Sequence, residues 1–119
     1  TIDGIWDDCY KAIHVANGAI KYIPEISMDQ SLANRLLGEA KFFRAWNYFN
    51  LVKIFGGVPL TVEPYESMEN MYLERASVEQ VYAQVESDLK DAVNALPAAT
   101  FYNNSNRITK YAAALYATR

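Results

Sequence analysis

The sequence predicts an all-α protein made of antiparallel helical hairpins, and three observations carry that prediction. Apolar residues recur at steps of three and four through most of the chain, as they do on one face of a helix. Two segments, residues 27–30 and 77–80, have the Ser-x-x-Gln pattern of a helix N-terminal capping box. Prolines and a pair of glycines stand where the apolar periodicity breaks, so they mark the helix ends.

Composition narrows the class of protein. The chain has 119 residues, enough for one compact unit, and about half of them are hydrophobic. The net charge is −3 and the 11 basic residues are scattered, which excludes the basic footprint of a nucleic-acid-binding protein. No apolar run approaches the ~20 residues of a membrane span. The single cysteine, Cys9, cannot form an internal disulfide.

The first helix is expected at about residues 3–22, and Pro24 ends it. The second is expected at about residues 28–55, with Ser27 as its cap and Gln30 reaching back to the cap. From residue 42 to residue 55 this helix is apolar nearly all round, Trp46 and Phe49 included. The pattern predicts a central helix that is buried on several sides.

The stretch KIFGGVPL, residues 53–60, looks at first like a phosphate-binding loop. Such a loop needs its glycines before a helix N-terminus, where free N–H groups point at the anion. Here the glycines follow a helix, so Gly56 is expected as a left-handed C-terminal residue and Gly57 as a loosening of the next turn. Pro59 pushes the preceding residue to extended geometry. We interpret the stretch as a helix stop followed by a short extended exit, with one possible β-bridge.

A long irregular connection, residues 56–76, leads to a third helix at about residues 77–96. We expect its aromatic residues to hold this loop on the surface, with Arg75 tying it down. The acidic residues of the third helix, Glu86, Asp88 and Asp91, are interpreted as a solvated face. A fourth helix is expected at residues 109–119, and because its pattern is still helical at the last residue we expect the natural protein to continue.

The two halves of the chain echo each other weakly at an offset of 72 residues. The pair Cys9-Tyr10 matches Val81-Tyr82, and each pair is followed by an apolar residue three positions after its tyrosine. The echo favours two hairpins of related pattern in a tetratricopeptide-like stack. One function compatible with such a stack is a peptide-binding adaptor, which would line its concave groove with basic or amide side chains.

Residues that could carry catalysis or bind a metal are few. His14 is the only histidine, and no metal-ligand spacing surrounds it. Cys9 lies on the apolar stripe of the first helix, where we expect a buried, inert thiol. Asp7 and Asp8 are successive, so they point to different sides of a helix and cannot act as a carboxylate pair. The sequence therefore predicts no enzyme, no metal site and no cofactor.

Two further features concern charge and sugar chemistry. Arg44 lies among aromatic residues, where a charge is costly unless it pairs with an acidic residue or caps backbone carbonyls. The loop FYNNSN, residues 101–106, places Tyr102 beside Asn103 and Asn104. Aromatic rings stack on pyranose faces and amides bond hydroxyl groups, so these three are candidate glycan contacts. The loop also has the composition of an ordinary turn, which is the more common role for such residues.

The sequence also contains a recognisable signature. Residues 38–64, GEAKFFRAWNYFNLVKIFGGVPLTVEP, resemble the signature of the SusD/RagB family of outer-membrane glycan-binding lipoproteins. The preceding helix (WDDCYKAIHVANGAIKYI) and the two that follow (RASVEQVYAQVESDLKDAVNALP and NRITKYAAALYATR) fit the family in order. Asn106 stands where the family usually has glycine. The resemblance covers essentially residues 1–119, as one helical segment of a larger SusD-like domain.

The resemblance implies a function. Family members are several times longer, are anchored at the cell-surface side of the outer membrane of Bacteroidetes through a lipidated N-terminal cysteine, and are not enzymes. They work with a TonB-dependent, SusC-like transporter to capture oligosaccharides or other nutrients. Cys9 lies inside a helix and cannot be the lipidated residue. The matching residues, including Arg44, Trp46, Gly56, Gly57 and Pro59, match as scaffold, because family ligand contacts come mostly from loops outside this region.

Overall fold

The structure, a computed structural model, describes residues 2–62 and 75–95. In that part of the chain it contains helices α1 (Ile2–Tyr22), α2 (Gln30–Phe55) and α3 (Val78–Ala95), with a short 3-10 turn η1 (Ile23–Glu25) between the first two. The predicted all-α class is confirmed. The fourth predicted helix, residues 109–119, lies outside the described residues.

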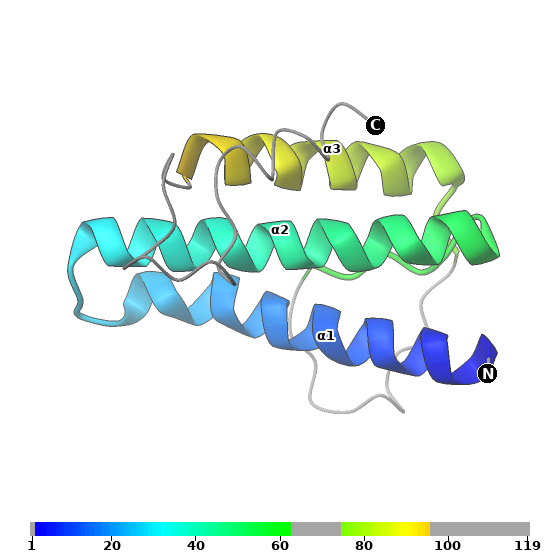
Figure 1. Ribbon diagram of the computed structural model, residues 1–119, viewed down its shortest axis with the longest axis horizontal. Coiled ribbons are helices and arrows are strands. Elements are labelled where there is room, and N and C mark those ends of the chain that lie inside the picture. Colours follow the sequence, from blue (N-terminus) through cyan, green and yellow to red (C-terminus); the bar gives the residue numbers. More distant parts are fainter. Residues whose placement is uncertain (1, 63–74, 96–119) are drawn as a thin grey trace, which may run out of the picture.

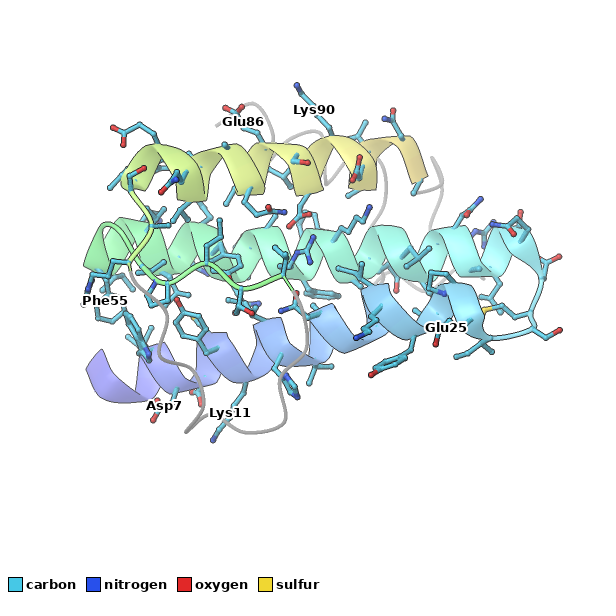
Figure 2. All side chains as sticks on the ribbon, turned by 180° about the vertical axis from the view of Figure 1, so that it is seen from behind. Asp7, Lys11, Glu25, Phe55, Glu86 and Lys90 are labelled. Atoms are coloured by element: carbon cyan, nitrogen blue, oxygen red, sulfur yellow. The ribbon has the colours of Figure 1, made fainter. Side chains whose placement is uncertain are left out.

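The three helices lie side by side in one layer with α2 in the middle (Figure 1). Each is antiparallel to its neighbour in the layer, so α1 and α2 form one hairpin and α3 returns along the other side of α2. The segment that leaves α2 crosses one face of this layer, as the view from behind shows (Figure 2). The outer edges are polar: Asp7 and Lys11 point away from α1, and Glu86 and Lys90 point away from α3.

The N-terminus of α2 differs from the prediction. The cap is Asp29, whose carboxylate accepts a hydrogen bond from the backbone N–H of Leu32 at 3.1 Å. Gln30 does not reach back to a Ser27 cap but donates to Asn34 at 2.9 Å. An aspartate at this position accepts a hydrogen bond from a free N–H, as a serine also can. It additionally places a negative charge at the positive end of the helix dipole, which a serine cannot do.

The N-terminus of α3 confirms the second capping box. The backbone N–H of Gln80 donates to the Ser77 hydroxyl at 3.1 Å, and the backbone N–H of Ser77 donates to the Gln80 side chain at 2.8 Å. Both bonds satisfy donors that helix geometry leaves free. On the same helix Val81, Val85, Leu89 and Ala92 are buried, as the apolar stripe predicts.

The core forms where α2 contacts both neighbours and the segment that follows it. Its largest fully buried side chains include Tyr10, Ile13, Tyr48, Leu51, Val58 and Val81. The central position of α2 and its burial on several sides are as predicted, since Phe42, Ala45, Tyr48, Leu51 and Val52 are all buried. The helix is not covered all round, however. Trp46 is 37% exposed, Phe43 48% and Ile54 49%. In a single layer a middle helix has two covered flanks and one crossed face, so side chains on its remaining face stay accessible.

The glycine pair has two separate roles. Gly56 ends α2 with a positive φ of 75°, and its N–H still bonds the Val52 carbonyl at 3.0 Å. Gly57 does not simply loosen the turn: a Cβ there would lie 2.4 Å from the backbone oxygen of Ala76. The absence of a side chain at Gly57 therefore allows the two ends of the long connection to approach closely.

The exit of α2 is held against the start of α3. Pro59 and Arg75 form an isolated antiparallel bridge, which confirms the predicted single β-bridge. The N–H of Ala76 donates to the Val58 carbonyl at 3.0 Å, and the Arg75 guanidinium donates to the Gly57 carbonyl at 2.7 Å. Arg75 also stacks over the Trp6 ring at 5.7 Å. Arg75 thus ties down this junction as predicted. The rest of the connection, residues 63–74, lies outside the described residues.

Candidate functional site

A buried ion pair joins α2 to α3 at the centre of the layer. The Arg44 Nε donates to one carboxylate oxygen of Asp88 at 2.8 Å, and Arg44 Nη2 donates to the other at 2.7 Å. Arg44 is 5% exposed and Asp88 is 1% exposed. Gln84, one turn earlier on α3, adds a third hydrogen bond to the Asp88 carboxylate at 3.1 Å. This two-pronged geometry is the strong form of an arginine–carboxylate pair.

The same guanidinium reaches the first helix. Arg44 Nη1 donates to the Asn17 side-chain oxygen at 3.0 Å, and the Asn17 amide donates to the Thr61 carbonyl at 3.2 Å. Asn17 is fully buried. One connected polar network therefore links α1, α2, α3 and the segment that leaves α2. A buried charge is tolerated here because its donors are paired.

Two tyrosines fix that segment to the helices. The Tyr48 hydroxyl donates to the Thr61 carbonyl at 2.7 Å and accepts from the Thr61 N–H at 2.6 Å. The Tyr10 hydroxyl donates to the Pro59 carbonyl at 2.5 Å. A segment that is not part of a sheet thus has its buried backbone groups paired by side chains. We call Arg44, Asp88, Asn17, Tyr48 and Thr61 the polar tie.

Arg44 confirms one prediction, and Asp88 corrects another. Arg44 pairs with an acidic residue, as its apolar surroundings required. Asp88 is not part of a solvated face, in contrast to Glu86 and Asp91, which are exposed. The signal was present in the sequence, because Asp88 falls three residues after buried Val85 and four before buried Ala92, on the apolar stripe.

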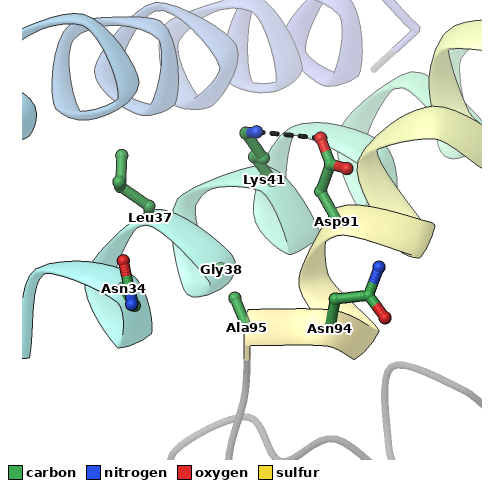
Figure 3. A pocket seen from close by; sticks show the side chains of 7 residues that line it. All are labelled: Asn34, Leu37, Gly38, Lys41, Asp91, Asn94 and Ala95. Atoms are coloured by element: carbon green, nitrogen blue, oxygen red, sulfur yellow. Dashed lines mark hydrogen bonds and ion pairs between the residues drawn. The ribbon is translucent and has the colours of Figure 1, made fainter. Parts of the chain in front are cut away.

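A shallow groove opens between α2 and α3, near the start of α2 and the end of α3 (Figure 3). Its volume is about 340 Å³. The Lys41 ammonium and the Asp91 carboxylate, 2.8 Å apart, join the two helices across it. Asn34 lies on the α2 side and Asn94 on the α3 side. The lining described for this groove includes no aromatic ring on which a sugar could stack, and its two charges neutralise each other.

The other predicted site residues stand as follows. Tyr102, Asn103 and Asn104 lie outside the described residues, so they remain a prediction. Cys9 is buried, and burial together with the nearby Asp8 carboxylate raises the pKa of its thiol above the ordinary 9.0. The predicted burial of Cys9 is confirmed, and its inertness stays a prediction that the raised pKa supports. Among residues 2–62 and 75–95, no three His, Cys, Asp or Glu side chains are grouped so as to hold a metal ion. No helix in that part of the chain is both long and apolar enough to cross a bilayer.

The described residues form a layered stack of helices held by a buried polar tie, and comparison with known proteins places the chain in a family. The family model described as "Starch-binding associating with outer membrane", a SusD-like model, matches residues 1–119. The SusD-like protein P38 of Formosa agariphila is 38% identical over 88 residues, 73% of this chain and 17% of that protein. The SusD-like protein P2 of the same organism is 28% identical across 99% of this chain and 24% of its own length.

Solved structures agree with these relatives. A SusD-like protein from Bacteroides fragilis superposes with a TM-score of 0.89 and 33% identity, over 98% of this chain and 23% of the other. A laminarin-binding SusD-like protein superposes with a TM-score of 0.85 and 37% identity, over 92% of this chain and 24% of the other. The chain belongs to the SusD-like family. It spans about a quarter or less of the length of these relatives.

Proposed function

We propose that this chain is the helical scaffold of a non-enzymatic glycan-binding protein, which captures oligosaccharides at the outer face of the outer membrane. The observation that carries the proposal is the 37% identity to a laminarin-binding SusD-like protein across 92% of this chain. The family model, whose description names starch binding and the outer membrane, supports the same assignment. We further propose a lipid anchor in the full-length protein and a TonB-dependent, SusC-like transporter as its partner.

The internal construction of the described residues supports a scaffold role. The polar tie holds three helices and the extended exit in one arrangement, and the Pro59–Arg75 bridge holds the segment that leaves α2 beside the segment that enters α3. Binding loops need such a rigid base, since ordering a loop on ligand binding costs free energy. The groove of Figure 3 carries the amide and charged groups suited to hydrogen bonding but has no ring to stack on a sugar.

Calorimetric titration tests the proposal. We expect the full-length protein to bind laminarin oligosaccharides, and we expect residues 1–119 alone to bind them weakly or not at all. Circular dichroism must show that the isolated segment is helical for the second result to count. No heat from the full-length protein with laminarin, starch or other glycan oligosaccharides would contradict the glycan assignment, and tight binding by the segment alone would contradict the scaffold assignment.

The candidate glycan contacts need a separate test. We propose Tyr102, Asn103 and Asn104 as contacts, because an aromatic ring beside two amides has the chemistry of sugar binding. In the full-length protein, Tyr102→Ala is expected to weaken oligosaccharide binding about tenfold, the loss of one stacking contact. Tyr82→Ala, an exposed tyrosine on α3, is the matched control and leaves affinity unchanged. Equal affinity of the two variants would remove Tyr102 from the site.

A peptide-binding adaptor is a second candidate, and one observation favours it. The groove between α2 and α3 is lined by Lys41 and the amides Asn34 and Asn94, the residue types expected for gripping a peptide backbone. A fluorescently labelled peptide without net charge, titrated into the full-length protein, would detect this activity. Peptide binding would favour the adaptor if Lys41→Ala abolishes it and added oligosaccharide does not affect it. If the peptide does not bind, the glycan-binding proposal is the one candidate function that remains.

A further inference from the structure

A second groove, apolar in character, runs between α1 and α2. Its volume is about 430 Å³. The lining residues are Ala12, Val15, Ala16, Ala19, Ile23, Leu36, Glu39, Ala40, Phe43 and Asn47. Four of them are alanines, so the floor is low, and two large apolar side chains flank it in the open: Val15 is 70% exposed and Phe43 is 48% exposed. We call this surface the alanine groove.

The alanine groove lies on the face of the layer that the α2 exit does not cross. Asn17 points to that exit segment, where it bonds the Thr61 carbonyl. Val15 stands two residues earlier on the same helix, a rotation of about 200° around the helix axis. Its side chain therefore points to the opposite face. Exposed apolar surface gathered in one groove is uncommon unless another surface covers it.

The other surfaces of the layer are poor places to bury apolar groups. At its two edges the charged side chains Asp7, Lys11, Glu86 and Lys90 point outward (Figure 2). The face opposite the alanine groove is already occupied by residues 58–61, which are bonded to Tyr10 and Tyr48. Of the surfaces that the described residues present, the alanine groove is the one whose shape and polarity suit a further helix.

We infer that an amphipathic helix from the part of the full-length protein outside these 119 residues packs along the alanine groove. The relatives that share this fold are about four times as long, since the chain covers 23% and 24% of two of them. In helical stacks each hairpin buries its apolar face on the next. An alanine floor lets a helix approach to the short end of the usual 8–10 Å axial separation.

The dimensions and lining of the alanine groove also predict the length and the residue pattern of the helix that packs there. Ala12 on α1 and Ile23 at the start of η1 mark its ends, about 16 Å apart at 1.5 Å per residue, which matches three helical turns. The occupant should therefore present aliphatic side chains at spacings of three and four over about 11 residues, fitted between Val15 and Phe43. Glu39 and Asn47 at the margin suit polar residues on its flanks. The inference rests on the exposed apolar lining of the groove and on family membership, and it is independent of which ligand the protein binds.

Thiol labelling of the full-length protein tests the inference. Val15→Cys reports on the alanine groove, and Lys11→Cys, on the polar edge of the same helix, is the matched control because it is exposed in either case. We expect the monomer, verified by light scattering, to label Val15→Cys on the order of 100-fold more slowly with a maleimide than Lys11→Cys. Rates within about threefold of each other overturn the inference. So does protection that appears only at dimer-forming concentrations or only when a membrane partner is added.

Photo-crosslinking identifies the occupant. With p-benzoylphenylalanine in place of Val15, the monomer is expected to form an internal crosslink to a peptide outside residues 1–119, located by mass spectrometry. A crosslink to residues 1–119 themselves, or to a second molecule, contradicts the inference. Because neither experiment uses a glycan, their failure would leave the proposed function standing, and loss of glycan binding would leave this inference standing.

Discussion

Arg44 and Asp88, 44 positions apart in the sequence, meet in the core as a two-pronged ion pair with N–O distances of 2.7 and 2.8 Å. The pair joins the central helix α2 to α3, and through Asn17 it also reaches α1. A buried ion pair does not by itself imply net stabilisation, since desolvation offsets much of the Coulomb energy. Its structural consequence is register: both partners are satisfied only when α2 and α3 are in this one alignment.

The first prediction concerns this pair. Asp88→Ala leaves the Arg44 guanidinium buried without its carboxylate, so we expect a loss of about 3–5 kcal/mol in the free energy of unfolding. Asp91→Ala is the control, since Asp91 belongs to the half-exposed pair with Lys41, and its loss should cost less than about 1 kcal/mol. Urea denaturation measures the loss for each variant, provided that the slope of the unfolding free energy against urea concentration is the same as in the parent protein. Equal effects of the two substitutions would contradict the assignment.

The doubly substituted protein separates register from stability. Arg44→Met with Asp88→Leu removes both charges, so most of the loss caused by Asp88→Ala should be recovered. If the pair fixes alignment, the double variant will be nearly as stable as the parent but will show faster amide hydrogen exchange in α3. A double variant as unstable as Asp88→Ala would mean that packing volume, and not the uncompensated charge, explains the loss.

Much of the fold was predictable because its signals are local. The helices follow from apolar periodicity, the α3 cap from Ser77 and Gln80, and the stop after α2 from Gly56. The sequence also predicts that Arg44 pairs with an acceptor, since an arginine among aromatic residues needs one, but it does not identify the partner. These arguments need only a residue and its neighbours within one or two turns.

What the sequence did not predict depends on contacts between distant segments. The interpretation of Asp88 as solvated followed the polar residues Glu86, Ser87 and Lys90 around it, although its position on the stripe of α3, next to buried Leu89, places it in the core. Ser27 and Asp29 are both good caps, and nothing within the segment decides between them. The pairing of Tyr48 with Thr61 requires knowing where the chain travels after α2. The candidate glycan contacts at residues 102–104 lie outside the described residues and remain a prediction.

A second prediction tests the close approach at Gly57. Gly57→Ala would place a Cβ 2.4 Å from the Ala76 backbone oxygen, so the exit of α2 and the start of α3 must separate. We expect a loss of about 1–3 kcal/mol, in the range of overpacked cores. Gly18→Ala is the control: nothing lies within 4 Å of its added methyl group, and an alanine inside α1 should stabilise by about 0.5–1 kcal/mol. Thermal or urea unfolding measures the change in the free energy of unfolding for each variant, which should be a loss for Gly57→Ala and a gain for Gly18→Ala.

A third prediction tests how the extended exit is held. Tyr48→Phe removes both bonds between the hydroxyl and the Thr61 backbone, which lie at 2.6 and 2.7 Å in a buried site. The expected cost is about 1–3 kcal/mol, and the Thr61 amide should exchange with solvent faster. Tyr82→Phe makes the same chemical change at an exposed position on α3 and should alter neither quantity. Unchanged exchange at Thr61 in Tyr48→Phe would show that other contacts hold the segment.

A fourth prediction concerns the pH dependence contributed by Cys9. Burial, assisted by the Asp8 carboxylate, raises the pKa of the folded thiol above the ordinary 9.0. Below pH 9.0 the thiol is protonated in both the folded and unfolded states, so its contribution to stability is fully present there. As pH rises past that value the unfolded thiol ionises first, the unfolded state becomes more favourable, and stability falls until the folded pKa is passed. Cys9→Ala should therefore flatten the decline of the unfolding free energy above pH 9.0, although the smaller side chain lowers stability at every pH.

The accessibility of the same thiol can be measured directly. In the parent protein the thiol should react with a disulfide reagent at pH 8 only as fast as the protein opens, and urea should accelerate the reaction. Rapid reaction under native conditions would show that Cys9 is accessible and would contradict its place in the core.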